Sequence, residues 1–289
     1  MSEAVGQRTD GISMARLVMN VTDLDASCAF YETVSPLRLL RRRKSAEAAP
    51  DGGLRDGEVA VLADPADPAG PELHLLRWPG VPASRPYPAF YHVGFVKVCF
   101  SCPDIDAKLA QLRAAGVHPV NATIERRYTS VLDPTGVIVS FFEYEPLSRE
   151  TFFHVNLSVR DLAPALGFYS DALGLTEWRA SASPEPVPAA QGPGSDVSQW
   201  DSHLLRSPVS DFSLDISRIR YPGPIGRPYA SRDNVGIMSL SLRTEADLAG
   251  LVSAATAAGG TVDREQAGGQ GDRVMLLDPE GSRIELVGP

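Results

Sequence analysis

The twelve residues NVTDLDASCAFY, at positions 20–31, return in the same pattern as SVRDLAPALGFY at positions 158–169. Two later stretches also recur in the same order, GFVKVCFS (94–101) as GIMSLSLR (236–243) and VLDPTGVIVSFF (131–142) as LLDPEGSRIELV (276–287). The offsets between the paired stretches drift only from 138 to 145 residues. Ordered repetition of this kind indicates two tandem copies of one unit.

Each copy itself reads as two smaller units in series. An apolar strand pattern over residues 14–21 is followed by a helix pattern over 24–34 and then by three strand patterns. The order of strand, helix and strands starts again at residue 96, and the second copy repeats it. The sequence therefore predicts four modules of this type, with irregular connections over 45–57 and over the proline-containing stretch 180–199.

The composition is that of a globular protein with an acidic balance. The chain has 289 residues, 43% of them hydrophobic, and a formal net charge of −9. An acidic chain is not attracted to nucleic acid or to anionic membranes, so we expect neither as a partner. Its apolar stretches are shorter than a bilayer requires, residues 1–10 lack the apolar core of a secretory signal, and three cysteines are too few for a disulfide framework. We therefore expect a cytoplasmic protein.

A strand ending in V-x-D-L, a helix containing Phe-Tyr and a later D-P-x-G-x-x-x-E-L hairpin form a specific combination. The chain carries these motifs at residues 21–24 with 30–31, at 159–162 with 168–169, and at 278–286. The combination resembles the vicinal oxygen chelate superfamily, which includes glyoxalase I, the extradiol dioxygenases, and the fosfomycin and bleomycin resistance proteins. The resemblance covers nearly the whole chain.

The resemblance implies a fold. Members of the family pair βαβββ modules into U-shaped mixed sheets, and the concave face of a sheet holds a divalent metal. We therefore expect an α+β protein of four βαβββ modules in two U-shaped mixed sheets. The two glyoxalase-like domains are expected at residues 1–148 and 149–289, with the active site in the second domain and no metal in the first.

Strand alternation indicates which polar side chains face the cavity. Val155 and Leu157 form the apolar face of one strand, so His154 and Asn156 point the other way. The same reasoning places further polar side chains of the second copy on the cavity face, namely Asp215, Ser217, Ser239, Ser241, Arg243 and Glu285.

The family takes its metal ligands from the first and last strand of each module. The corresponding positions hold Arg16, Glu72, Lys97 and Ser140 in the first copy, and His154, Asp215, Ser239 and Glu285 in the second. Arg16 and Lys97 are cations that repel a divalent metal. His154, Asp215 and Glu285 supply an imidazole and two carboxylates, a set suited to Fe2+ first and also to Mn2+, Ni2+, Co2+ or Zn2+. Ser239 departs from the family pattern, in which metalloenzymes usually have a histidine.

The pairing of the modules decides whether these three ligands meet. Pairing within each half brings them together, as in the extradiol dioxygenases, whose first half is structural and second half catalytic. Pairing of the first module with the fourth, as in some fused glyoxalases, separates Glu285 from His154 and Asp215. The segregation of cations from ligands favours pairing within each half. In the alternative without a metal, the two carboxylates form ion pairs with Arg218, Arg243 or Arg283.

Two classes of function follow. The first is a metal-dependent enzyme, an oxidoreductase of the dioxygenase type or else an isomerase or lyase, acting on a small oxygenated compound of aromatic or polyketide-like character. The second is a metal-free protein that binds and sequesters a small molecule, as antibiotic-resistance members do. We assign no catalytic residue, and a homodimer stays open. The residues expected to line the substrate pocket are Asn156, Ser239, Ser241, Arg243, Tyr221 and Tyr229.

Overall fold

The structure of the chain is a computed structural model. It describes residues 11–48, 54–79, 86–123, 127–144, 148–188, 194–195, 197–207, 210, 212–229, 234–266 and 272–288. No helix within these ranges is long and apolar enough to cross a lipid bilayer.

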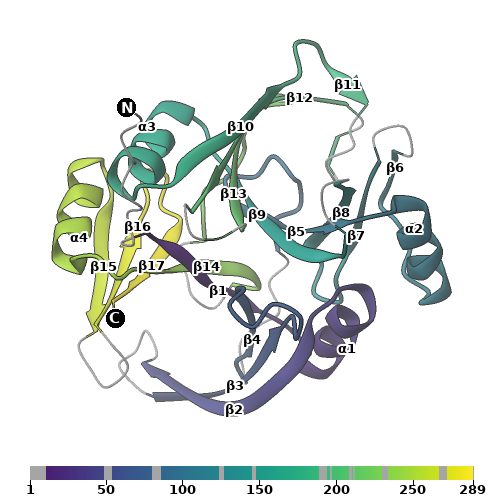
Figure 1. Cartoon of the computed structure of the whole chain (residues 1–289), viewed down its shortest axis with the longest axis horizontal. Helices are drawn as coiled ribbons and strands as arrows, with labels where there is room; N and C mark the ends of the chain where they lie inside the picture. The colour runs from purple at the N-terminus through teal and green to yellow at the C-terminus, as the bar shows by residue number, and fades with distance from the viewer. Residues whose placement is uncertain are drawn as a thin grey trace, which may run out of the picture.

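Four modules follow one another along the chain (Figure 1). The first contains β1 (Ser13–Asn20), α1 (Leu24–Val34), β2 (Arg38–Ala48), β3 (Leu54–Ala63) and β4 (Glu72–Arg77). The second contains β5 (Gly94–Cys102), α2 (Ile105–Ala114), β6 (Asn121–Thr123), β7 (Tyr128–Leu132) and β8 (Ile138–Glu143). The third contains β9 (Thr151–Ser158), α3 (Leu162–Leu166) continued by a π-helical turn (Gly167–Ala172), β10 (Thr176–Ala182), β11 (Val187–Pro188), β12 (Val197–Arg206) and β13 (Ser213–Tyr221). The fourth contains β14 (Gly236–Arg243), α4 (Leu248–Ala257), β15 (Thr261–Gln266), β16 (Arg273–Leu277) and β17 (Arg283–Val287).

These strands form two mixed sheets, which confirms the predicted α+β fold. The eight-stranded sheet has the order β15-β16-β17-β14-β1-β4-β3-β2, and the nine-stranded sheet has the order β10-β12-β13-β9-β5-β8-β7-β6 with β11 paired to β12. The first module therefore shares a sheet with the fourth, and the second with the third. Figure 1 shows this directly, because purple β1 from the start of the chain lies beside β14 from its last quarter.

The expectation that modules pair within each half is wrong. In both sheets the first strands of two modules meet as antiparallel neighbours, β1 with β14 and β5 with β9. Only the short connection of residues 144–150 separates β8 from β9, so the third module is placed directly beside the second. The distribution of charged side chains, on which the expectation rested, does not determine which backbones form hydrogen bonds.

Both stretches expected to be irregular contain strands. Residues 45–57 belong mostly to the β2–β3 hairpin, and 49–53 lie outside the described residues. In the stretch 180–199, β10 extends to Ala182 and the short β11 pairs with β12, while 189–193 and 196 lie outside the described residues. Proline does not prevent this pairing, because an edge strand has no second partner that needs its missing N–H.

The sequence motifs of each half meet in space. Asp23 and Asp161 cap α1 and α3 by accepting hydrogen bonds from the backbone of Ala26 and Ala163. The Tyr31 hydroxyl donates to Asp133 Oδ2 at 3.1 Å. In the second half the Tyr169 hydroxyl donates to Asp278 Oδ2 at 2.9 Å. The Phe-Tyr motif of one module is therefore joined to the Asp-Pro hairpin of the next.

Each sheet has one face covered by helices and one without them. Leu17 and Leu73 in the eight-stranded sheet, and Val155 and Leu214 in the nine-stranded sheet, are buried in one continuous core that also contains Tyr31 and other helix residues. Because side chains alternate along a strand, their neighbours lie on the opposite face, which we call the helix-free face. The polar residues predicted to face a cavity lie on the helix-free faces, as alternation requires.

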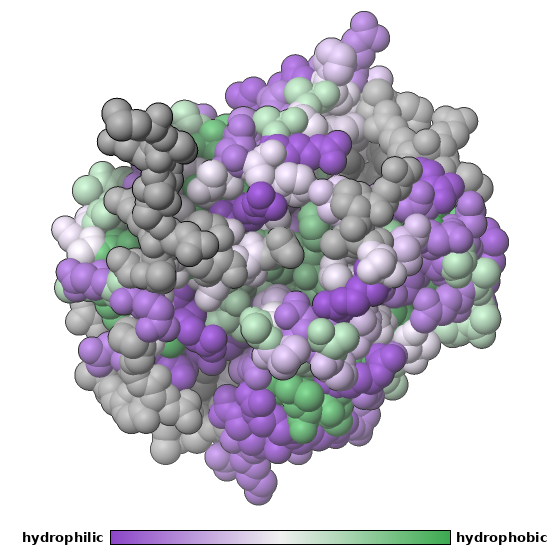
Figure 2. Space-filling model, viewed as in Figure 1, coloured by the Kyte–Doolittle hydropathy of each residue, from purple (hydrophilic) through white to green (hydrophobic). Residues whose placement is uncertain are grey.

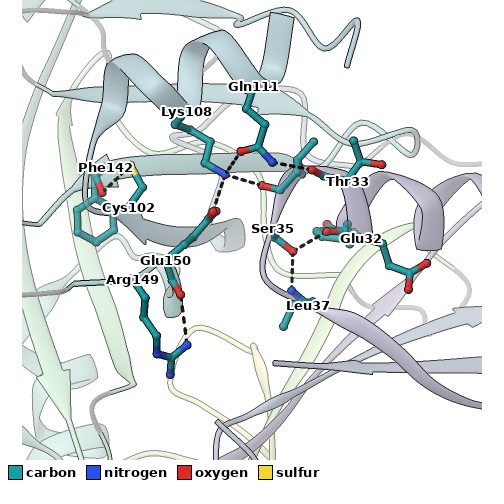
Figure 3. A network of polar contacts seen from close by, with 12 residues as sticks. Glu32, Thr33, Ser35, Leu37, Cys102, Lys108, Gln111, Phe142, Arg149 and Glu150 are labelled. Atoms are coloured by element: carbon teal, nitrogen blue, oxygen red, sulfur yellow. Dashed lines mark hydrogen bonds and ion pairs between the residues drawn. The ribbon is translucent and has the colours of Figure 1, made fainter. Parts of the chain in front are cut away.

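A buried polar network joins the two halves where the second module passes into the third (Figure 3). The Lys108 ammonium of α2 donates to the Val34 carbonyl at 3.1 Å, to Gln111 Oε1 at 2.8 Å and to Glu150 Oε2 at 2.6 Å. Gln111 in turn donates to the Thr33 carbonyl at 3.0 Å. Since Val34 and Thr33 end α1, one lysine ties two helices to the connection between the halves.

Candidate functional site

A cavity of about 220 Å³ opens on the helix-free face of the nine-stranded sheet. Its polar floor comes from adjacent strands, with Lys97 on β5, His154 and Asn156 on β9, and Asp215 and Ser217 on β13. Aromatic rings form its walls, namely Phe90, Phe142, Tyr144, Phe153, Trp178 and Trp200. We call this space the aromatic cavity.

The Asp215 carboxylate is held by hydrogen bonds from three neighbours. Asn156 Nδ2 donates to Oδ2 at 2.9 Å, while the hydroxyls of Ser202 and Ser217 donate to Oδ1 at 2.5 and 3.0 Å. The register explains this set, because Asn156 lies directly opposite Asp215 on the neighbouring strand. The carboxylate is therefore fixed in orientation and its acceptor sites are largely used.

His154 is the least satisfied polar group of the floor. Its side chain is buried, its Nε2 lies 3.9 Å from Asp215 Oδ2, and its Nδ1 has no hydrogen-bond partner. Burial, which disfavours the charged imidazolium, lowers the pKa of His154 to about 4, and the positive charge of Lys97 acts in the same direction against the attraction of Asp215. At neutral pH the cavity floor thus carries a neutral imidazole.

Lys97 supplies the positive charge of the floor. Its side chain is buried, and its Nζ lies 5.8 Å from the centre of the Tyr128 ring. Burial alone lowers the pKa of an ammonium group, but electrostatic interactions with Tyr128, Cys99 and Asp215 outweigh it and raise the pKa of Lys97. An ammonium and a carboxylate therefore face the same small space.

The aromatic walls pack against one another and against the imidazole. The Phe142 and Phe153 rings lie 5.3 and 5.5 Å from that of His154. Tyr144 lies 5.4 Å from Phe153 and 6.2 Å from Trp178. Such walls offer edges and faces to a flat ligand, whose polar atoms would then meet the floor.

Two comparisons place this architecture among known proteins. The family described as Glyoxalase/Bleomycin resistance protein/Dioxygenase superfamily matches residues 13–141, and the family described as Glyoxalase-like domain matches residues 154–287. The chain belongs to the vicinal oxygen chelate superfamily. No curated protein matches it in sequence.

Solved structures of the superfamily share the whole fold. Glyoxalase I from Zea mays is 19% identical, with a TM-score of 0.74 over 96% of this chain and 93% of that one. The structure named "putative dioxygenase from Bacillus subtilis subsp. subtilis str. 168" is 13% identical, with a TM-score of 0.64 over 96% of this chain and 86% of that one. At these identities the likeness concerns the fold alone.

The structure brings together two of the three residues expected to bind metal in this superfamily member. His154 and Asp215 share the aromatic cavity, whereas Glu285 lies in the eight-stranded sheet. There the Arg16 guanidinium contacts Glu285 Oε2 at 2.5 Å, and the Ser241 hydroxyl donates to the same oxygen. The cause is the pairing of modules, which separates β17 from β9 and β13.

Most of the residues expected to line the substrate pocket also lie elsewhere. Only Asn156 lines the aromatic cavity. Ser239 and Ser241 belong to β14 in the other sheet, and Arg243 borders a separate cleft between the sheets. Tyr221 is 48% exposed, and the Tyr229 ring stacks on Tyr87 with centres 4.1 Å apart. The expectations for Ser239, Ser241 and Arg243 assumed that the third and fourth modules share a sheet, whereas the fourth module pairs with the first.

The donors present do not fit a protein-bound divalent metal. Within the described ranges no three His, Cys, Asp or Glu side chains converge on one point. The aromatic cavity offers one imidazole and one carboxylate, beside an ammonium that repels a dication, and the carboxylate already accepts three hydrogen bonds. In the eight-stranded sheet an arginine contacts the carboxylate instead.

Sequence reasoning missed most of the aromatic walls and several polar residues of the cavity, namely Arg179, Ser181 and Ser202. Phe153 was assigned to neither face, and Ser202 and Trp178 lie on strands for which no alternation was worked out. Within β12 the spacing of Trp200, Ser202 and Leu204 follows the period of a strand, and all three line the cavity. That spacing is the signal that could have found them.

The lowered pKa of His154 predicts a loss of stability in acid. The neutral native imidazole has a pKa of about 4 against an ordinary value of 6.5, so the unfolded chain binds a proton first as the pH falls. Stability due to this group is present above pH 6.5 and is lost towards pH 4. Between pH 7 and 4.5, urea unfolding of the wild type should lose about 2 kcal/mol more than that of His154→Gln. Equal losses in the two proteins would show that His154 is accessible to protons in the native state.

Proposed function

We propose that the chain is a small-molecule-binding member of the superfamily. It takes a compact, oxygen-bearing aromatic compound into the aromatic cavity without a divalent metal held by the protein. The observation that carries the proposal is the separation of the expected ligands, since Glu285 contacts Arg16 in one sheet while His154 and Asp215 face Lys97 in the other. This function corresponds to the metal-free class considered from the sequence.

The cavity supports such a ligand in size and in chemistry. A volume of about 220 Å³ holds one compact ring system. The His154 imidazole and the Lys97 ammonium line the cavity and would meet oxygen atoms of the ligand, and the aromatic walls would cover its faces. Each polar group buried by the ligand then gains a partner, which gives specificity for oxygenated rings.

The second candidate is the metal-dependent enzyme of the dioxygenase type, or an isomerase or lyase. One observation favours it, because His154 Nδ1 is a buried, unpartnered nitrogen in a neutral ring beside a carboxylate. In this case His154 and Asp215 would be the protein ligands of an ion such as Fe2+, and Glu285 would not take part. The two candidate functions differ in whether ligand binding survives the removal of metal.

The deciding experiment combines elemental analysis with calorimetry. Protein purified without added metal, and protein reconstituted anaerobically with Fe2+, would be analysed for bound iron, manganese, nickel, cobalt and zinc. Catechol would then be titrated into the protein in the presence of a chelator. We expect no near-stoichiometric metal, and catechol binding that persists in the chelator.

Two variants locate the binding. Trp178→Ala removes a cavity wall and should weaken catechol binding at least tenfold, whereas Tyr221→Ala removes an exposed aromatic ring outside the cavity and should leave it unchanged. Stoichiometric metal that is lost in His154→Ala and kept in Glu285→Ala would replace our proposal with the metalloenzyme. Metal lost in both variants would contradict the observed module pairing as well.

A further inference from the structure

The eight-stranded sheet repeats the geometry of the aromatic cavity with different side chains. Its register places Arg16 opposite Ser241 and Ser241 beside Glu285. The nine-stranded sheet places Lys97 opposite Asn156 and Asn156 beside Asp215 in the same way. Both sheets thus contain a cation, a neutral hydrogen-bonding residue and a carboxylate in one row. The side chains around that row differ between the two sheets, and in the eight-stranded sheet they include several arginines.

Arginines crowd the helix-free face of the eight-stranded sheet. Strand pairing places Arg41 opposite Val61 and Arg43 opposite Val59. On the other side of Arg16, Arg273 contacts Glu285 at 3.7 Å. Five arginines with described side chains on this face, Arg16, Arg41, Arg43, Arg273 and Arg283, form a surface that we call the arginine face.

Carboxylates balance only part of this charge. Glu285 contacts Arg16 and Arg273, Glu72 contacts Arg41 at 3.0 Å, and Asp263 lies 3.8 Å from Arg283. Five guanidinium groups therefore face three carboxylates among these described side chains. The local balance is positive in a chain whose net charge is −9. Such a local excess attracts anions.

His74 adds no charge to the arginine face. It lies within the face and its Nε2 is 2.6 Å from Glu72 Oε2. Burial lowers the pKa of His74 to about 4, and the positive charges of Arg16 and Arg43 lower it as well, against the effect of Glu72. The imidazole therefore stays neutral at pH 7.

An apolar patch adjoins the two outer arginines. Val59, Val61 and Leu76 form a small buried cluster on this face, against which Val18 and Trp78 pack. The Trp78 ring is fixed by a hydrogen bond of 3.2 Å from Nε1 to Asn20 Oδ1. Because Val59 and Val61 lie opposite Arg43 and Arg41, the guanidinium groups border the patch. A ligand bound there would meet cations at one end and an apolar surface at the other.

We propose that the arginine face is a second ligand site, which binds an organic anion. Its carboxylate or phosphate group would lie at Arg41 and Arg43, and its apolar body would cover the partly exposed side chains of the patch, Val18 and Trp78. Guanidinium groups bind both oxyanions through paired N–H donors, which a lysine does not offer. The site is separate from the aromatic cavity, so this proposal can be tested independently of the function proposed above.

Strand alternation supplies a matched control for this site. Arg41 and Arg43 point to the helix-free face, while Arg42 and Lys44, opposite Ala60 and Glu58, point to the other face of the same strand. All four side chains are exposed, and Figure 2 shows a mostly hydrophilic surface along the lower edge of the view, where β2 runs. Arg41→Met/Arg43→Met and Arg42→Met/Lys44→Met therefore remove the same charge from the same strand, on opposite faces.

The experiment measures binding of three naphthalene probes by calorimetry. They are 2-naphthoate, 2-naphthyl phosphate and the neutral 2-naphthol. We expect Arg41→Met/Arg43→Met to weaken binding of an anionic probe at least tenfold, and Arg42→Met/Lys44→Met to change it less than twofold. Binding of 2-naphthol should be the same in both variants. Tighter binding of one anionic probe identifies its oxyanion as the one preferred.

Three results would overturn the proposal. If both double variants weakened binding of the anionic probes equally, the effect would come from the overall charge of the protein and not from a site on the helix-free face. No binding of either anionic probe to the wild type would show that the arginines serve the fold alone. Inorganic phosphate that binds as tightly as 2-naphthyl phosphate would remove the role of the apolar patch. Loss of catechol binding in the aromatic cavity would affect the function proposed above and leave this inference intact.

Discussion

Lys108→Met is expected to lower the free energy of unfolding by about 3–5 kcal/mol, the cost of leaving a buried charge without its partner. The Lys108 side chain is 3% exposed and that of Glu150 is 20% exposed. The substitution leaves the Glu150 carboxylate uncompensated, and it also removes the donor to the Val34 carbonyl at the end of α1. Burial already raises the pKa of Glu150, so its charged form depends on Lys108. Urea unfolding at pH 7.5 measures the loss.

Two further variants test the cause. Arg42→Met breaks an exposed ion pair with Asp25 and should change stability by less than about 0.5 kcal/mol. The double variant Lys108→Met/Glu150→Met removes both buried charges and should regain most of the stability that the single variant loses. A single variant that unfolds like Arg42→Met would show that the buried network contributes nothing to the junction of the halves.

Asp133→Ala should destabilise the protein by about 3 kcal/mol or more, because several buried donors lose one acceptor. Asp133 Oδ1 accepts hydrogen bonds from the backbone of Thr135, Gly136 and Val137 at 2.8–2.9 Å, and Oδ2 accepts from Tyr31. Burial raises the pKa of Asp133 to about 6, so unfolding should be measured at pH 7.5, where the carboxylate is ionised.

The repeat supplies the controls for this second prediction. Asp133→Asn keeps an acceptor oxygen and should lose clearly less than the alanine variant. Asp278→Ala removes the equivalent acceptor of Tyr169, Glu280 and Ser282 in the second half and should match Asp133→Ala. Asp104→Ala removes only an exposed cap of α2, which costs about 1 kcal/mol. An Asp133→Ala loss no larger than that of Asp104→Ala would contradict the prediction.

The modules could be predicted from the sequence because the residues that indicate each element lie close together along the chain. The cap at Asp23, the tyrosine at position 31 and the Asp-Pro turn at position 133 each lie in a short segment whose residue types determine its geometry. Alternation correctly placed His154 and Asp215 on the face that bears the cavity. These features follow from neighbours within a few residues along the chain.

The candidate site could be predicted only in part, because it depends on which strands are neighbours. The period of a strand says which face a side chain is on, and nothing about the strand beside it. Glu285 has the right orientation on β17, yet β17 adjoins β14, and Arg16 reaches it across a sequence separation of 269 residues. The sequence shows a cation and a carboxylate at equivalent positions of the repeats. It does not show that the two side chains lie next to each other in each sheet.

The exchange of modules between halves also sets an order of assembly during synthesis. Every ladder of the nine-stranded sheet joins strands between residues 94 and 221, so this sheet can close while the ribosome is still making the last quarter of the chain. The eight-stranded sheet must wait, because β1 finds its partner β14 only after more than 200 further residues have been made. Until then the nascent first module presents an open strand edge, which is the form most open to unwanted pairing with other chains. A circular permutant that begins at β5 would make the fourth and first modules consecutive and remove that waiting period.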